Sequence, residues 1–193
     1  MPEDDLESAL AADLDGSFER LVLAFQDRLY GFVLRYTGSP EDAEEVVQDA
    51  LIRAYRALST YEPKRVRGLA LRAWLYRIAL NTARNRARGR RPATAPLEAP
   101  GDDRGVPEPA AADRERPDAV VEAAERTDHL RRLLAALPAR YRAAVVLRHL
   151  DGMGYDEVAE ILGRPVGTVK SDVHRGMRLL RDAQAPQRRN GVA

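Results

Sequence analysis

One stretch in the middle of the chain most constrains what it can fold into. Residues 91–117 consist almost entirely of Pro, Ala, Gly and charged side chains, with hardly any large apolar residue. Such a segment cannot bury enough apolar surface to offset the entropy lost when its backbone is ordered. We therefore predict two small domains on either side of a disordered linker. The predicted boundaries are an acidic N-terminal extension at 1–14, a first domain at 15–90, the linker at 91–118, a second domain at 119–182 and a disordered tail at 183–193.

Outside this linker, apolar residues recur at intervals of three and four, which is the period of an amphipathic α-helix. Asp15 or Ser17 can cap the first helix, and Ser39 followed by Pro40 can start the second. The predicted fold class is therefore all-α. Helices are expected at about 15–38, 39–58 and 69–90 in the first domain, with a loop at 59–67, and at about 119–136, 138–150, 155–162 and 166–181 in the second.

The last two predicted helices have the spacing of a helix-turn-helix. Gly163 suits the left-handed turn between them, and Pro165 resets the chain before the final helix. The alternative for this segment is a pair of packed helices with a solvated basic face. The outward face of the final helix carries residue types that contact base edges and phosphates, namely Thr168, Lys170, Ser171, His174, Arg175 and Arg178.

Charge is segregated along the chain, although the formal net charge is only +1. Residues 1–60 carry 13 acidic and 5 basic side chains, whereas residues 61–91 carry 1 and 10. The alternation repeats, because residues 92–126 carry 9 and 4 and residues 127–193 carry 7 and 12. Basic zones are the usual footprint of nucleic-acid binding, and an acidic amphipathic zone indicates a protein partner. Solvated helix faces are the plain alternative.

The same composition argues against several classes of function. Cysteine is absent and the three histidines are scattered, so neither a disulfide framework nor a metal site is expected. We see no nucleophile–base pair and no phosphate-binding loop, and we therefore expect neither an enzyme nor a cofactor. No apolar run approaches the ~20 residues of a bilayer span, and the acidic N-terminus lacks the features of a secretory signal. We expect a cytoplasmic protein without membrane insertion.

Several motifs of the chain resemble those of the extracytoplasmic-function (ECF) sigma factors of bacterial RNA polymerase. They stand in the order that the family shows: DAEEVVQD at 42–49, WLYRIA at 74–79 followed by Asn81, Leu137-Pro138, YDEVA at 155–159 and PVGTVKS at 165–171. The resemblance covers about residues 15–90 and 119–182. It implies a transcription initiation factor that recognises promoters.

The resemblance implies a role for each domain. The first, region two of the family, docks on the clamp helices of the largest subunit of core RNA polymerase and captures the minus-ten element of the promoter as a melted single strand. The second, region four, places its helix-turn-helix in the minus-thirty-five element. An anti-sigma protein is a further expected partner, beside core RNA polymerase and promoter DNA.

The functional positions of the family are carried over onto matching residues. Core-polymerase binding is expected on the acidic face of the second helix, at Asp42, Glu45, Gln48 and Asp49. Minus-ten binding is expected at Arg72, Arg77, Asn81, Arg84 and Arg88, because an Asn can pair with a base edge and an Arg can hold phosphate. Minus-thirty-five binding is expected at Thr168, Lys170, Ser171, His174, Arg175 and Arg178.

Two residues leave a choice open. Trp74 could stack on a single-stranded base, but it shares a stripe with Leu71 and Ile78, which favours core packing. Asp172 stands where many relatives carry a basic residue, and phosphate would repel its carboxylate unless the carboxylate is paired or accepts a hydrogen bond from a cytosine amino group. We expect its partner to be Arg175, three residues along the same helix.

Two other functions are weighed against this interpretation. A stand-alone two-domain helix-turn-helix transcriptional regulator would bind duplex DNA without polymerase. It would usually need a ligand pocket, and no convergent polar cluster appears in residues 15–90. A helical adaptor for protein partners would leave the strongly basic third helix unexplained.

Overall fold

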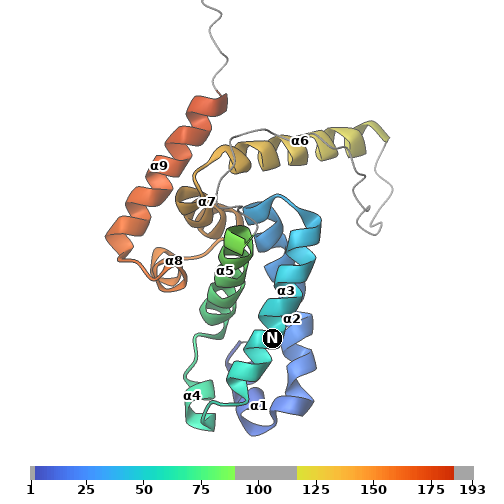
Figure 1. Ribbon diagram of the computed structural model, residues 1–193, viewed down its shortest axis with the longest axis vertical. Helices are drawn as coiled ribbons and strands as arrows, with labels where there is room; N and C mark the ends of the chain where they lie inside the picture. The colour runs from blue at the N-terminus through green and yellow to red at the C-terminus, as the bar shows by residue number, and fades with distance from the viewer. Residues whose placement is uncertain (1–2, 90–116, 185–193) are drawn as a thin grey trace, which may run out of the picture.

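The computed structural model describes residues 3–89 and 117–184 of the chain. These residues form helices joined by short turns, with no strand among them, so the predicted all-α fold is confirmed (Figure 1). Most of the predicted linker and tail, at 90–116 and 185–193, lies outside the described residues.

The described part of the first domain consists of α1 (Glu3–Ala12), α2 (Leu14–Thr37), α3 (Pro40–Leu58), α4 (Pro63–Arg67) and α5 (Leu71–Gly89). Asp13 caps α2, since its carboxylate accepts a hydrogen bond at 3.0 Å from the backbone N–H three residues on. The predicted caps, Asp15 and Ser17, are therefore wrong and lie inside the helix. Ser39 caps α3 as predicted.

Two short helices go beyond the sequence prediction. α1 lies in the acidic N-terminal extension and buries Leu6 and Leu10. α4 replaces part of the predicted loop, because Pro63 fits the first turn of a helix and Val66 is buried. The two helices pack against each other at one end of the domain (Figure 1). Apolar contacts therefore stabilise both helices. Each helix is too short for the periodicity of its apolar residues to predict it.

The body of the first domain is formed by α2, α3 and α5. Their apolar stripes meet in a core in which Leu21, Phe25, Phe32 and Leu75 are almost fully buried. Trp74 is only 5% exposed and belongs to the same core. The prediction that Trp74 packs in the core is therefore confirmed, and the polar faces of α3 and α5 are left to the surface.

The described part of the second domain consists of α6 (Pro117–Ala136), α7 (Ala139–Val145), the π-helical turn η1 (Val146–Leu150), α8 (Tyr155–Leu162) and α9 (Val166–Gln184). Gly163 ends α8 with a φ of 62°, in the left-handed region that glycine adopts without strain. The chain then enters α9 after Pro165. The turn at Gly163 is the one that the predicted helix-turn-helix requires.

The two domains pack directly against each other. α2 contacts α6, α7 and η1, and α5 lies beside α8 (Figure 1). The sequence interpretation treats the domains as separate modules, because helical periodicity reports only which face of each helix is apolar. Several of the contacts that join the domains are charged, and such contacts have no periodic signal.

Candidate nucleic-acid interface

A groove of about 290 Å³ crosses the first domain between α3, α5 and the turn that precedes α4. The Tyr61 ring lies against Trp74 with 6.1 Å between the ring centroids, and the Arg65 guanidinium lies 3.7 Å from the Tyr61 ring centroid. Aromatic rings flanked by amides and a cation can hold an unstacked base. The residues that line the groove include Arg53, Tyr61, Trp74, Ile78, Asn81 and Asn85.

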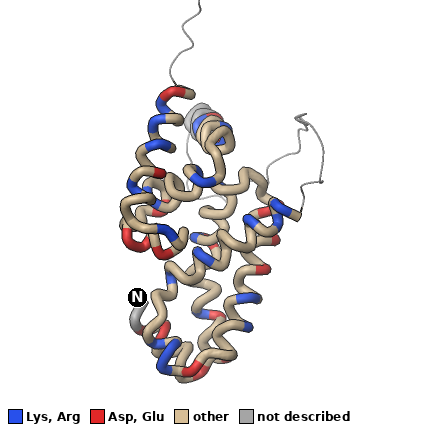
Figure 2. Tube along the Cα trace, turned by 60° about the vertical axis from the view of Figure 1, so that its left-hand side comes forward, with Lys and Arg blue, Asp and Glu red and all other residues tan. Residues whose placement is uncertain are grey.

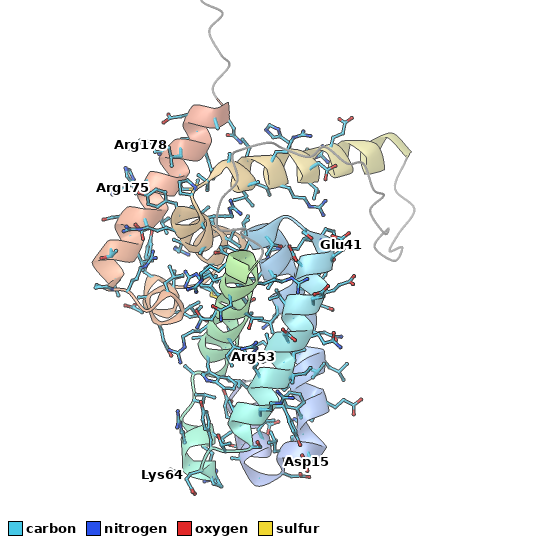
Figure 3. The ribbon with its side chains drawn as sticks, viewed as in Figure 1. Asp15, Glu41, Arg53, Lys64, Arg175 and Arg178 are labelled. Carbon is cyan, nitrogen blue, oxygen red and sulfur yellow. The ribbon has the colours of Figure 1, made fainter. Side chains whose placement is uncertain are left out.

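The groove brings together residues that the sequence analysis assigned and residues that it missed. Asn81, a predicted minus-ten contact, is exposed and lines the groove. Arg53 reaches toward α5 from α3 (Figure 3), and Tyr61 comes from the turn after α3. Neither had an assigned role. The available signal was an aromatic residue in a segment with several arginines, which is typical of single-strand binding.

The other predicted minus-ten arginines follow one side of α5. Arg77, Arg84 and Arg88 stand seven and four residues apart, so they share a face with Asn81. Arg77 and Arg84 are partly exposed and Arg88 is exposed. Arg88 Nη2 donates a hydrogen bond to Asn85 Oδ1 at 3.0 Å. A basic strip therefore continues from the groove toward the end of α5.

Arg72 does not share that face. It precedes Arg77 by five residues, which turns it well away from the basic strip. Its guanidinium contacts the second domain, where Arg72 Nη2 donates to the Asp151 backbone carbonyl at 3.0 Å. The structure therefore separates Arg72 from the other predicted minus-ten residues.

The outer side of α9 carries the predicted minus-thirty-five residues. Lys170, Ser171, His174, Arg175 and Arg178 are exposed, whereas Thr168 is partly buried. Arg175 and Arg178 project from the side of α9 that faces away from the rest of the molecule (Figure 3), and basic positions recur along this helix (Figure 2). An exposed helix with cations on one face fits the major groove of DNA.

Asp172 faces the interior of the second domain, so the predicted pairing with Arg175 is wrong. It is fully buried, and its carboxylate accepts hydrogen bonds from Arg140 Nε at 2.9 and 3.0 Å and from Arg164 Nη1 at 2.9 Å. Positions 169, 172, 173 and 176 form the buried face of α9. The hydrogen bond to Asp172 raises the pKa of Arg140. Asp172 thus ties α9 to α7 and to the turn after α8.

The predicted polymerase-binding residues lie on α3. Gln48 and Asp49 are exposed. Asp42 Oδ1 instead accepts a hydrogen bond from Arg86 Nε at 2.7 Å, and Glu45 forms an ion pair with the same guanidinium. The hydrogen bond to Asp42 raises the pKa of Arg86. Two of the four predicted residues are therefore engaged with α5 inside the chain.

A second groove, of about 570 Å³, lies between α2 and α3 on the side of Gln48. Tyr30, Val47 and Leu51 give it apolar walls, and Asp27 and Glu44 add negative charge. Nearby large apolar residues are exposed on the same helices, with Leu23 at 65% and Ile52 at 43%. An exposed apolar and acidic surface of this kind fits a protein partner with basic residues.

Within residues 3–89 and 117–184, no group of three His, Cys, Asp or Glu side chains is placed to hold a metal ion. In the same two stretches, no helix is both long enough and apolar enough to cross a bilayer.

Two family profiles match the chain over these surfaces. The profile described as Sigma-70 region 2 matches residues 21–92, and that described as Sigma-70, region 4 matches residues 127–180. The first range contains both grooves of the first domain, and the second contains the exposed face of α9.

Curated relatives are similar over most of their length. The RNA polymerase sigma-H factor of Pseudomonas aeruginosa is 34% identical over 172 residues, which cover 88% of this chain and 87% of the relative. The ECF RNA polymerase sigma-E factor of Escherichia coli is 37% identical over 161 residues, which cover 82% of each protein.

Solved structures show the same likeness. CnrH, in complex with the cytosolic domain of CnrY, aligns with a TM-score of 0.66 at 25% identity, over 94% of this chain and 98% of that chain. The sigma factor RpoE of Bartonella quintana, in complex with the anti-sigma factor NepR, aligns with a TM-score of 0.61 at 25% identity, over 86% and 94% of the two chains. Each alignment therefore spans both domains.

Proposed function

The chain belongs to the extracytoplasmic-function sigma factors, and from this membership we propose which of its surfaces binds the polymerase and which bind promoter DNA. It is a transcription initiation factor that binds core RNA polymerase and directs it to promoters. The family consists of non-enzymatic transcription factors. A stand-alone regulator is not favoured, because the similarity to sigma factors covers both domains.

We further propose that the chain performs no catalysis of its own and works in the cytoplasm, beside the polymerase and the chromosome. Residues 15–90 act as region two and residues 119–182 as region four, which the profile matches at 21–92 and 127–180 support. The segment 91–118 serves as a tether. A tether makes the second DNA contact effectively intramolecular once the first has formed, so two weak modules bind a promoter firmly.

The groove at Asn81 is the proposed site of the minus-ten element, and it carries the functional assignment. It combines the Tyr61 and Trp74 rings with the exposed Asn81 amide, and the basic strip of α5 continues from it. A base that leaves the duplex can lie in this groove beside the Tyr61 ring while Asn81 pairs with its edge, and the arginines of α5 then hold the phosphates. Arg53 is added to the proposed contacts, since it lines the same groove.

The exposed face of α9 is the proposed reader of the minus-thirty-five element. Lys170 and Arg178 suit phosphates as cations, whereas Ser171, His174 and Arg175 suit base edges. Asp172 is not part of this reading face because it is buried against Arg140 and Arg164.

The groove between α2 and α3 is the proposed dock for the clamp helices of core polymerase. Gln48 and Asp49 remain proposed contacts, and the exposed apolar residues Leu23 and Ile52 join them. Asp42 and Glu45 contribute their charge while they hold Arg86. An anti-sigma protein is the proposed regulator, as NepR is for the structural neighbour RpoE.

The test of the minus-ten assignment is Asn81→Ala in the full chain, mixed with core RNA polymerase. Loss of a base contact should reduce promoter opening about tenfold, as expected for the loss of ~1–3 kcal/mol of base discrimination. Permanganate reactivity of unpaired thymines measures opening, and gel filtration measures binding to core polymerase. Gln184→Ala, an exposed amide on the other domain, is the control. Normal opening by the Asn81 variant would refute the site, and a wild-type chain that neither co-elutes with core nor yields promoter-specific transcripts would refute the function.

Lys170→Ala tests the α9 face in the same holoenzyme. Binding to a duplex that carries the minus-thirty-five element should weaken to a similar degree for all sequences, and the salt dependence should become shallower by about one charge. Lys64, at the opposite end of the molecule (Figure 3), provides the matched Lys64→Ala control. If both variants bind this duplex as the wild type does, α9 does not contact DNA through Lys170.

A further inference from the structure

Tyr61 lines two cavities of the first domain. One is the groove at Asn81, and the other is a cavity of about 440 Å³ near the turn between α1 and α2. The second cavity lies where α1 meets the end of α3 and the start of α4, and its lining includes Leu10, Leu58, Val66 and Tyr61. The position of the Tyr61 ring therefore depends on the packing of α1 and α4.

The segment that carries Tyr61 has few stabilising contacts of its own. Residues 59–70 join α3 to α5, and their backbone hydrogen bonds link near neighbours, as from the Tyr61 N–H to the Leu58 carbonyl at 3.1 Å. The five residues of α4 are too few to form a stable helix in water by themselves. Val66 is the only buried residue between positions 59 and 70, and it is 4% exposed. The fold of this segment therefore depends on what covers Val66.

α1 supplies this cover. α1 and α4 pack against each other (Figure 1), and Leu6 and Leu10 of α1 are only 7% and 3% exposed. α1 also packs against α2, where Asp5 Oδ2 lies 3.5 Å from Arg20 Nη2. α1 therefore connects α4 to the body of the first domain.

α4 also places the cation beside the Tyr61 ring. Arg65 lies in α4, four residues after Tyr61, and its guanidinium is 3.7 Å from the ring centroid. Asn81 and Trp74 instead belong to α5, which the apolar core holds in place. A shift of α4 would therefore move Tyr61 and Arg65 relative to Asn81. Groups that recognise a ligand lose much of their effect when they are misplaced by about 1 Å.

We propose that α1 is a positioning element of the minus-ten site, and that Leu10 is its central residue. By holding α4 in place, α1 keeps Tyr61 and Arg65 at the groove that contains Asn81, so that an unstacked base meets a preformed site. Leu10 does not touch DNA and acts only through α4. This inference rests on the proposed function, because it takes the groove at Asn81 as the minus-ten site. It gives the acidic N-terminal extension a role in promoter recognition.

The first test uses Leu10→Ala in the full chain, without DNA or polymerase. Trp74 is the only tryptophan of the chain and lies against the Tyr61 ring, so its fluorescence reports the position of that ring. In the variant, the emission of Trp74 should shift to longer wavelength, and acrylamide should quench it more strongly. Leu10→Met retains most of the apolar volume and should restore the wild-type emission.

The second test measures promoter opening by the same variants with core RNA polymerase, on promoters in which each minus-ten base is replaced in turn. For Leu10→Ala, discrimination against the wrong base at one position should fall about fivefold, because groups held less firmly contribute less to recognition. Leu10→Met should discriminate as the wild type does. Binding to core polymerase, followed by gel filtration, should be unchanged in both variants, because the groove between α2 and α3 has no lining residue from α1.

Two controls make the same leucine-to-alanine change elsewhere and separate positioning from a general loss of stability. Leu134, in the second domain, is 1% exposed, so Leu134→Ala should lower the Tm without changing Trp74 emission or minus-ten discrimination. Leu130 is 37% exposed, and Leu130→Ala should leave all three at wild-type values. Val66→Ala removes the buried side chain of α4 and should reproduce both effects of Leu10→Ala. It therefore keeps the test decisive if circular dichroism shows that Leu10→Ala loses structure.

Each outcome bears on a different part of the inference. Wild-type Trp74 emission in folded Leu10→Ala and Val66→Ala would overturn the support of Tyr61 by α1. Shifted emission with wild-type discrimination would overturn the link to promoter recognition, and so would an equal loss of discrimination in Leu134→Ala. The emission is measured without DNA or polymerase, so it is independent of the proposed function. Failure of that function would instead appear as a wild-type chain that does not initiate transcription with core polymerase.

Discussion

The role of Asp172 becomes clear only from its surroundings in the folded protein. On the sequence it stands among DNA-contacting residue types, and its charge opposes phosphate binding. In the structure it is buried, and Arg140 and Arg164 neutralise it from two other elements. Both guanidinium groups are partly exposed, with 50% and 28% of their side-chain surface accessible. The two guanidinium groups can therefore also bind water, whereas the buried carboxylate depends on its two arginine partners for hydrogen bonds.

We expect Asp172→Ala to destabilise the second domain by ~1–3 kcal/mol, the usual cost of removing one partner from a buried hydrogen-bonded group. In this variant the side chains of Arg140 and Arg164 can rotate into water, which limits the loss of stability. Urea unfolding followed by circular dichroism measures it. Asp182→Ala, at an exposed position of the same helix, should leave stability unchanged. If Arg175→Ala destabilised the chain as much as Asp172→Ala, the pairing seen here would be incorrect.

At the scale of an element, the approach of α9 to α7 depends on a glycine. A Cβ atom added at Gly176 would lie 2.5 Å from Val145 Cγ2 and 3.3 Å from Tyr141 Cβ. Real Cβ atoms do not approach other atoms so closely, and the backbone of α9 therefore needs a residue without a side chain there. This contact therefore determines how far the exposed face of α9 lies from the rest of the second domain.

Gly176→Ala should consequently destabilise the second domain by ~1–3 kcal/mol, because overpacking forces the two helices apart. Gly167, in the first turn of α9, has open space around it. Gly167→Ala should stabilise the helix by up to ~1 kcal/mol through its higher helix propensity. Thermal unfolding of the two variants should therefore shift in opposite directions. Equal shifts would mean that the helices do not pack as closely as the structure shows.

At the scale of the whole molecule, the chain combines buried apolar residues within each domain with a charged seam between the domains. Leu21 and Phe25 are buried within the first domain, and Val146 and Leu147 within the second. The seam instead depends on Arg35, Arg72, Asp151 and Glu157, with polar atoms left unpaired. The cores should therefore survive a separation that the seam does not.

Hydrogen exchange can test this difference in the intact protein. On binding core RNA polymerase, amides of α8 and of the second half of α2 should exchange faster if the seam opens, since they lose contact with the other domain. Amides in the middle of α2 and α3 should keep their protection, because the first core stays folded. Unchanged exchange in α8 would mean that the packed arrangement persists on the polymerase.

Much of this organisation follows from the sequence itself. The spacing of apolar residues is local, so it fixes most helices, the buried position of Trp74 and the helix-turn-helix around Gly163. The same local pattern places Asn81, Arg77, Arg84 and Arg88 on one face of α5, and Lys170, His174 and Arg175 on the outer face of α9. These residues are near one another along the chain, and helical geometry alone brings them together.

Only the tertiary structure decided the contacts between distant residues. Arg35 is 116 positions from Asp151, and Arg72 is 79 positions from it, so no periodic pattern relates them. The same holds for Asp172, whose partner Arg140 lies 32 positions away. Charged pairs depend on where whole helices come to rest, whereas apolar stripes require only that some core exists. The helices and their faces were therefore readable from the sequence, while the charged contacts between the domains and the buried Asp172 cluster were not.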